Sequence, residues 1–561
     1  MSEADLGELV REVHDLQRRV RNLEQRLGER AEPVVQPKTQ EEASSRLPPN
    51  LLPVLGRALV AIAGAYVLRA LTELGVLAPV AGVAAGIAYA LVWLLVAARQ
   101  AASFPAMLSA ITSAIIVAPL LWEAATRLKV VSSSTSAAVL TGYACLALAL
   151  GWRRSPHIVA AIGPAAATLT AAALLLETHD LYPFTLALLA IGAALEFEAC
   201  RGHSSGSRWP TAVAADLAAI LLAWIVWRKE GLPEGYAAIS TRAALAVQFL
   251  LLGIYASSAV VRTLIQRHSF TALETAQTTA ALGIGIGEAA ALLAGSARGT
   301  VALGAIALAG GVACYVVSFV VAGLEIKWNF RAWASFGMLL VLAGTFLVLP
   351  ASGYWALWCA CAVICCWTAM TASRPTLGLH GAGYLLLGAL ACGAAAQPFS
   401  QWFLAAGDAV SWKAAIVVAS ALLAWGTIAR SLPGNTARWR NQASSFVLAA
   451  VIMWLLAGAA TRALVRAWPV GAAPADTLGT VVLTLVSVVL AWSGRRWERR
   501  ELIWLVCGLM GLGAWKLVAR DIPNEHNLTL VVSLSFYGGT LILLPRMLQK
   551  KELGRRSQRT G

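Results

Sequence analysis

Long apolar runs, each of about 18 to 24 residues, follow one another from residue 51 to residue 545, and short polar breaks separate them. A helix of about 20 residues crosses the hydrocarbon layer of a membrane, so each run is long enough to span it. None of the runs shows the alternation that a membrane β-strand of about 10 residues requires. The pattern therefore predicts an all-α, polytopic integral membrane helix array of about eighteen spans, at residues 51–71, 77–98, 104–123, 135–152, 156–176, 181–198, 211–227, 238–261, 270–294, 300–324, 330–349, 353–372, 376–396, 412–429, 443–464, 476–493, 501–518 and 527–545.

The N-terminal segment, residues 1–28, has a different periodicity. Apolar residues occupy both core positions of just over three heptads, with two leucines and two valines at one position and only leucine at the other. That combination favours a parallel two-stranded coiled coil. The alternative is a single amphipathic helix packed on its own membrane domain, because about three heptads are marginal in isolation. We expect a cytoplasmic coiled coil in which two copies associate through Leu9, Val13, Leu16, Val20 and Leu23.

Two further segments flank the membrane domain, which extends over residues 51–545. Residues 29–50 contain four prolines among polar residues and bury too little apolar surface to fold, so they are predicted to be a disordered linker. Residues 546–561 carry six basic residues and no long apolar run. Such a tail is attracted to anionic lipid on the cytoplasmic side of a membrane.

The composition supports the membrane assignment. The 561 residues are 58% hydrophobic and only 13% charged, whereas soluble domains are roughly 25% charged. The net charge of +15 could indicate a nucleic-acid partner, but basic residues are about twice as frequent in the breaks on one side of the array as in those on the other. This bias predicts that both termini are cytoplasmic (N-in, C-in), with the lipid bilayer as partner and no nucleic acid.

The first predicted span raises the question of charge in lipid, because GRALVAIAGAYVLRALTELG contains Arg57, Arg69 and Glu73. Arg69 and Glu73 are four residues apart and share one helix face, so we expect an ion pair at the outer interface. For Arg57 two interpretations stay open. Its long side chain can reach the cytoplasmic surface, or it can pair with a buried carboxylate.

The ninth span carries the strongest polar signal inside the membrane region. Glu274, Gln277 and Glu288 project from one face of the predicted helix, and small residues continue the same stripe. Ionisable groups at such depth face protein or water and often mark an ion or substrate path. The alternative is a structural role in which each carboxylate pairs with a basic residue of a neighbouring span.

A second polar cluster, Glu177, His179 and Asp180, lies in one short outer break. Two carboxylates and an imidazole could perform acid–base chemistry, but helix capping by Asp180 and exposure to solvent explain the cluster more simply. The four cysteines of WCACAVICCW fall on two helix faces and do not form one tetrahedral metal site. We predict no catalytic residue, no metal site and no cofactor.

The order of parts resembles a family of predicted bacterial polytopic membrane proteins of unknown function. The resemblance rests on the heptads that end at Leu27, on the Pro-rich linker, and on GRALVAIAGAYVLRALTELGVLAPVAGVAAGIAYALVWLL, in which a basic residue follows glycine at the start of the first span. It implies a multi-pass location in the bacterial cytoplasmic membrane and brings no established activity.

Three hypotheses for function follow. In the first, the protein transports or binds a small or lipid-linked solute along a path near the ninth span. In the second, it is a non-catalytic membrane scaffold or an envelope-stress component. In the third, it is a membrane-embedded enzyme that acts on a polyprenyl-linked substrate through Glu177 and Asp180; the absence of a long polar loop in the sequence disfavours this hypothesis.

Overall fold

A computed structural model describes residue 19 and residues 51–100, 103–154, 157–203, 205–228, 231–322, 327–403, 411–431, 439–467, 472–497, 499–524 and 527–549. The predicted coiled coil and linker, apart from residue 19, and most of the predicted basic tail lie outside these residues. The described chain consists of helices and their connections, without strands. Its elements are α2 (Leu51–Glu73), α3 (Pro79–Arg99), α4 (Ser103–Thr126), α5 (Ser133–Arg154), α6 (His157–Thr178), α7 (Leu181–Cys200), α8 (Arg208–Trp227), α9 (Thr241–Val260), η2 (Val261–Ile265), α10 (Ala272–Leu293), α11 (Ala297–Ala322), α12 (Lys327–Val348), α13 (Tyr354–Thr371), α14 (Pro375–Ala391), α15 (Ala396–Phe403), α16 (Trp412–Ser431), α17 (Trp439–Ala467), α18 (Ala472–Arg496), α19 (Arg500–Lys516), η3 (Leu517–Asp521), α20 (Ile522–Asn524) and α21 (Asn527–Gln549).

The predicted all-α polytopic array is confirmed. Sixteen helices in the described part of the chain are long and apolar enough to cross a membrane, and α14 with α15, which meet at a bend of 54°, would make a seventeenth crossing. Each of the eighteen predicted ranges coincides with one long helix. Two of these long helices, α2 and α14, are not among the sixteen, and α14 alone has 17 residues.

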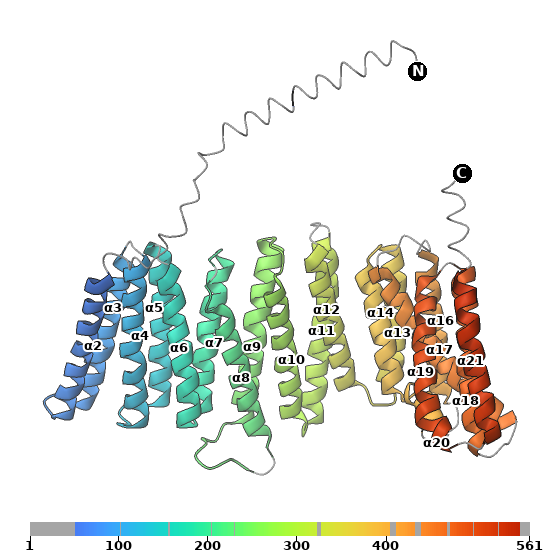
Figure 1. Cartoon of the computed structure of the whole chain (residues 1–561). Helices are drawn as coiled ribbons and strands as arrows, with labels where there is room; N and C mark the ends of the chain where they lie inside the picture. Colours follow the sequence, from blue (N-terminus) through green and yellow to red (C-terminus); the bar gives the residue numbers. More distant parts are fainter. Residues whose placement is uncertain are drawn as a thin grey trace, which may run out of the picture.

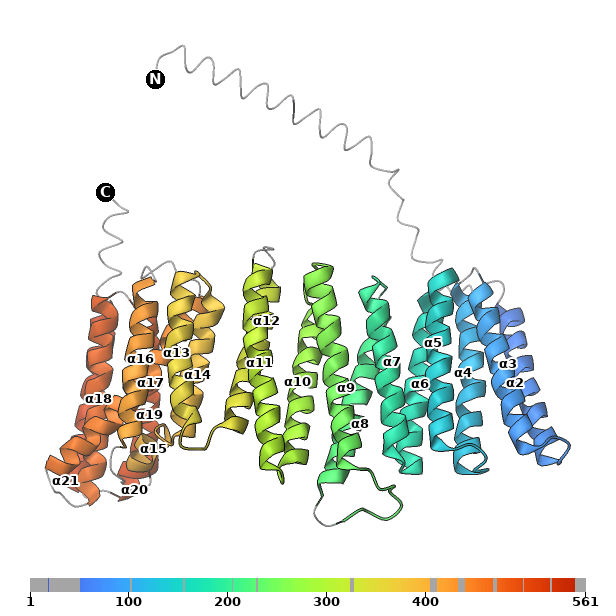
Figure 2. The ribbon, with the colours of Figure 1, turned by 180° about the vertical axis from the view of Figure 1, so that it is seen from behind.

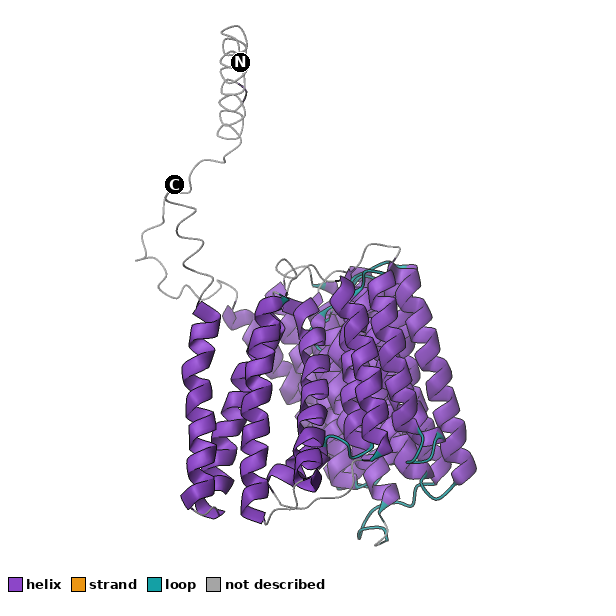
Figure 3. Ribbon diagram, turned by 90° about the vertical axis from the view of Figure 1, so that its right-hand side faces the viewer, coloured by secondary structure: helices purple, strands orange, loops and turns teal. Residues whose placement is uncertain are grey.

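The helices form an elongated row that follows the order of the chain, from α2 at one end to α21 at the other (Figure 1 and, from behind, Figure 2). Consecutive antiparallel helices pack as hairpins, among them α3–α4, α5–α6, α7–α8, α9–α10, α11–α12 and α13–α14. Neighbouring hairpins join because helices two positions apart also pack, such as α4 with α6 and α5 with α7. Figure 3 shows the row from one end.

Three large apolar cores hold the row together. The first extends from α3 to α10 and includes Leu94, Phe184 and Leu222. The second lies mainly among α13, α14, α16 and α17 around Trp355, and the third joins α15 and α17 to α18, α19 and α21 around Trp402. The hairpin α11–α12 stands between the first core and the second.

Glycines bring α11 and α12 into backbone contact. They recur at intervals of seven residues on both helices, as Gly304 and Gly311 on α11 and as Gly337 and Gly344 on α12. A Cβ atom added to Gly344 would lie 2.7 Å from the carbonyl oxygen of Gly304, and one added to Gly311 would lie 3.1 Å from that of Gly337. Small residues let membrane helices approach closely and replace side-chain packing by backbone contact.

The first residue of α2 and the last residue of α21 lie on the same face of the row (Figure 1). We call this the N-terminal face. Because consecutive long helices alternate in direction, α7 begins on the opposite face and α8 begins on the N-terminal face.

This arrangement predicts the outcome of a topology experiment. Reporter fusions that end after Asp180 and after Arg208 should be found on opposite sides of the membrane, since only α7 crosses between the two positions. The fusion after Arg208 should be cytoplasmic because the basic bias assigns that side. Alkaline phosphatase and green fluorescent protein activities of paired fusions measure the two locations. Two fusions on one side would contradict the crossing of α7.

Candidate functional site

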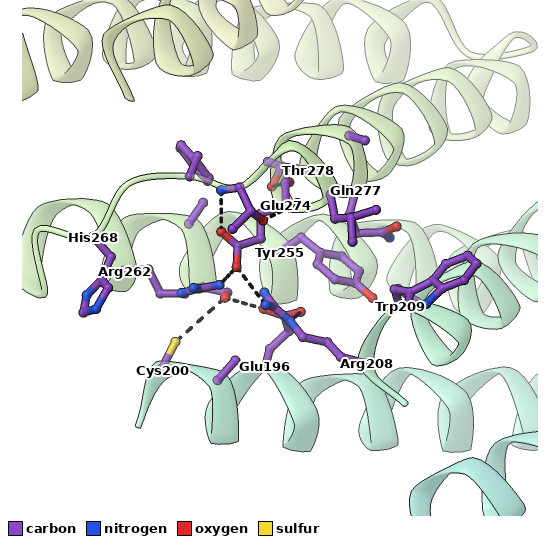
Figure 4. A pocket seen from close by; sticks show the side chains of 18 of the residues that line it. Glu196, Cys200, Arg208, Trp209, Tyr255, Arg262, His268, Glu274, Gln277 and Thr278 are labelled. Atoms are coloured by element: carbon purple, nitrogen blue, oxygen red, sulfur yellow. Dashed lines mark hydrogen bonds and ion pairs between the residues drawn. The ribbon is translucent and has the colours of Figure 1, made fainter. Parts of the chain in front are cut away.

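A cavity of about 910 Å³ lies among α7, α8, α9 with η2, and α10, at their ends near the N-terminal face (Figure 4). Its wall combines charged groups with an apolar surface. The charged and polar side chains that matter below are Glu196, Arg208, Asp216, Tyr255, Arg262 and Glu274.

Arg208, the first residue of α8, joins two carboxylates at the mouth of this cavity. Its guanidinium donates two parallel hydrogen bonds to Glu196 of α7, at 2.6 and 2.7 Å, and a third to Glu274 of α10, at 2.8 Å. Arg262 of η2 also donates to Glu274. Two arginines therefore neutralise two glutamates. The bidentate pair of Arg208 with Glu196 is of a kind that is strong and has a defined geometry. These four residues are named the mouth network.

Local structure positions the mouth network. Thr271 caps α10, and its backbone N–H donates to the Glu274 carboxylate at 3.0 Å while its hydroxyl accepts from the Glu274 N–H. This capping box fixes the carboxylate at the helix start. Arg262 lies in the π-helical turn η2, and such turns insert an extra residue into a helix, often at functional sites. Ser258 supports Glu196 by donating a hydrogen bond of 2.5 Å.

A second polar pair lies deeper, between α8 and α10. The amide of Gln277 donates to Asp216 at 2.9 Å. Asp216 is only 7% exposed, and its other carboxylate oxygen is buried without a hydrogen-bond partner in the described residues. Tyr255 lies between Gln277 and the mouth network (Figure 4). Apolar side chains, including Trp209 and Val213, complete the wall.

The three polar residues predicted to share one face of the ninth span do not all lie at one site. Glu274 and Gln277 line the cavity, whose wall on α10 ends at Ala280. Glu288 lies outside it, is half-buried, and makes no hydrogen bond or ion pair with a described residue. The cavity therefore uses the first turns of α10 and not the whole stripe.

The charges of the first span lie at two places. Arg69 pairs with Glu73 at 3.0 Å and with Glu123 of α4 at 2.9 Å, and it lines a second cavity, of about 810 Å³, on the face opposite the N-terminal face. Arg57 is exposed and pairs with no described residue. The predicted ion pair of Arg69 with Glu73 is thus present, and it is part of a larger cluster.

The side chains of the predicted outer cluster, Glu177, His179 and Asp180, do not come together at one site. Glu177 is exposed and lines the second cavity, whereas the ring of His179 packs edge-on against Tyr236, with centroids 4.7 Å apart. Asp180 is the N-cap residue of α7, but the expected capping hydrogen bond is absent. Its backbone (φ −95°, ψ 82°) departs from the extended conformation that N-caps usually adopt, which explains the difference.

The sequence interpretation missed the basic half of the mouth network. Basic residues in the breaks serve there only as topology signals, and none of Arg208, Arg262, Glu196 and Asp216 is singled out. Charge balance could have predicted these contacts. Acidic residues buried in neighbouring spans need cationic partners, and arginines lie at the start of α8 and just after α9. No sequence feature distinguished Tyr255.

A separate buried ion pair lies at the opposite end of the row. Lys516 and Asp521 are both 0% exposed and are 2.6 Å apart. Thr480 of α18 bridges them, with its hydroxyl 3.0 Å from the Lys516 ammonium and 2.5 Å from Asp521. Within the described residues, no group of three or more histidine, cysteine, aspartate or glutamate side chains could hold a metal ion.

Comparisons with known protein families, with curated proteins and with solved structures give no match. The fold and the cavity define a polytopic α-helical membrane protein with a charged cavity among four of its helices. The interpretation of that cavity rests on its chemistry.

Proposed function

We propose that the protein binds a small amphipathic or lipid-linked solute in the cavity among α7–α10 and moves it along this part of the membrane domain. The observation that carries the proposal is the cavity itself, which combines a volume of about 910 Å³ with a charged mouth and an apolar wall. Ligand sites are mostly apolar concave spaces of about 300–1,000 Å³ with a few placed polar groups. A membrane protein that only needs close packing gains nothing from such a space.

The lining residues suggest how a solute would be held. Trp209 and Val213 belong to the cavity wall and are also 58% and 40% exposed, so the cavity borders the outer surface of α8. A hydrocarbon chain could lie along this border, where it would bury apolar surface at both contacts. The polar part of the solute would then face Tyr255 and the polar side chains of the cavity wall.

The proposal includes a location. The N-terminal face would be the cytoplasmic one, since the breaks on that side carry the excess of basic residues, and the membrane would be the bacterial cytoplasmic membrane, as the family resemblance implies. The cavity would then be open toward the cytoplasmic leaflet. Self-association through the N-terminal heptads is part of the same proposal and would place two such cavities in one assembly.

The scaffold hypothesis is the second candidate, and one observation favours it. Both oxygens of Glu274 are already occupied, one by the two arginines and the other by the Thr271 N–H. A closed set of ion pairs fits a structural joint among four helices. The enzyme hypothesis has less support, because Glu177 and His179 contact different parts of the molecule.

Photo-crosslinking distinguishes the two candidates. Benzoylphenylalanine placed at Val213, in the cavity wall, should capture a solute of defined mass that co-purifies with the protein, and mass spectrometry of the adduct measures it. The matched control is Leu217, one turn further along α8, which is 61% exposed and does not line the cavity. Adducts at Leu217 should be bulk phospholipid. The same bulk phospholipids at both positions, or no adduct at Val213, would leave the scaffold as the better account.

A further inference from the structure

We infer that the solute carries an ammonium group and that Asp216 receives it inside the cavity. The inference rests on the proposed function, because it names the chemical class of solute that the same cavity takes. It rests on Asp216, the one carboxylate of the cavity wall that has no cationic partner among the described residues.

The three acidic residues of the cavity wall differ in how their charge is matched. Glu196 and Glu274 are each bound by arginine in the mouth network. Asp216 has only the neutral amide of Gln277 on one oxygen, and its second oxygen is buried without a partner among the described residues. A buried carboxylate with an unmatched charge is costly, and a cation that also donates hydrogen bonds compensates for its removal from water. A ligand ammonium supplies both.

The position of Asp216 suits the end of an amphipathic amine. Asp216 is eight residues beyond Arg208 on α8, so it lies about 12 Å deeper along the helix axis. The rings of Tyr255 and Trp209 line the same cavity (Figure 4). Aromatic faces attract cations, more strongly where water is excluded.

Other donors fit this position less well. A hydroxyl group would satisfy the free oxygen of Asp216 but would leave its charge unmatched. A metal ion would need several oxygen ligands, whereas no described metal-ligand cluster includes Asp216. An organic cation with N–H donors matches the charge, the hydrogen bond and the apolar wall together.

Protection of a native cysteine tests the inference. Cys200 lines the cavity, and the exposed cysteines Cys145 and Cys507 lie on other helices and serve as internal controls. Purified protein in nanodiscs is treated with N-ethylmaleimide, and the labelling rate of each cysteine is followed by peptide mass spectrometry. Dodecylammonium and dodecanol, which share one chain and differ in the head group, are added as probes.

We expect dodecylammonium to slow the labelling of Cys200 at a concentration at least about tenfold lower than dodecanol, without a change at Cys145 or Cys507; a tenfold difference corresponds to about 1.4 kcal/mol. Asp216→Asn should remove this preference while dodecanol still protects. Glu288→Gln, which neutralises a carboxylate of α10 outside the cavity, should retain it.

Two results would overturn the inference, and they are distinguishable. Equal protection of wild-type Cys200 by both probes would mean that the cavity binds chains whatever their head group, so the ammonium assignment fails and the proposed function stands. Protection by neither probe would remove the proposed function as well. The comparison of probes on wild-type protein decides the matter even where the Asp216 variant does not fold.

Discussion

Replacement of Lys516 by methionine should lower the free energy of unfolding by about 3–5 kcal/mol, the cost of leaving a buried charge without its partner. Lys516 and Asp521 are fully buried and 2.6 Å apart. Methionine keeps much of the length and apolar volume of the lysine stem but removes the ammonium. The Asp521 carboxylate would then retain only the Thr480 hydroxyl among these contacts.

The π-helical turn η3 explains how this pair forms within one continuous helical segment. Lys516 ends α19, and Asp521 is the last residue of η3, five positions later. In an α-helix residues three and four apart are neighbours, whereas the wider π turn brings residues five apart into register. The pair therefore depends on the turn, and loss of the charge attraction should also loosen η3.

Two variants control the Lys516 experiment. The double substitution Lys516→Met with Asp521→Leu removes both charges and should recover much of the lost stability, as expected for a buried pair whose desolvation cost offsets its attraction. Lys413→Met removes a half-buried lysine that has no ion pair in the described residues, and it should have little effect. Thermal and denaturant unfolding in detergent measure all three. A single variant as stable as the double variant would contradict the interpretation.

Substitution of Gly344 by alanine should destabilise the α11–α12 hairpin by roughly 1–3 kcal/mol, the usual cost of overpacking. The new methyl group would lie 2.7 Å from the carbonyl oxygen of Gly304 and 2.8 Å from the backbone nitrogen of Leu308. Backbone atoms cannot rotate away as a side chain can, so the two helices must separate. The measurement is the midpoint of thermal unfolding of the purified protein.

Gly310 of α11 provides the matched control. An added Cβ atom there would meet only the Leu340 side chain, at an ordinary distance of 3.5 Å. Gly310→Ala should be neutral or stabilising by up to about 1 kcal/mol, because alanine favours helix more than glycine does. If both alanine variants raise the unfolding midpoint, the backbone contact of α11 with α12 is not what limits stability.

The sequence was sufficient for the helices because one quantity, the length of an apolar run, decides whether a segment can cross the membrane. This explains why each predicted span coincides with a long helix. The exception is α14, which ends at Ala391 inside the predicted range 376–396 and needs the short α15, across a bend of 54°, to form a crossing. A bend depends on how two segments pack, and the hydrophobic pattern of the sequence does not predict that packing.

The candidate site was only partly predictable for a related reason. The helical period placed Glu274 and Gln277 on one face, and both line the cavity. The same period added Glu288, but a helix face continues along the whole helix whereas the cavity ends after Ala280. The partners of Glu274 are Arg208, 66 residues away, and Arg262, 12 residues away. Ion pairs between residues so far apart in the sequence depend on which helices pack together. The pattern of charges along the chain does not determine this packing.

The row of hairpins also has a consequence for the surrounding bilayer. A closed bundle shields its inner helices, whereas an extended row keeps a large part of most helices in contact with lipid, as the exposed Val92, Leu217, Ile306, Leu423 and Val489 illustrate from one end to the other. Lipids adapt their thickness to the apolar length of the protein they touch. Along this molecule such adaptation would occur on two long borders, so the apolar length of the helices would set the bilayer thickness along a line in the membrane plane.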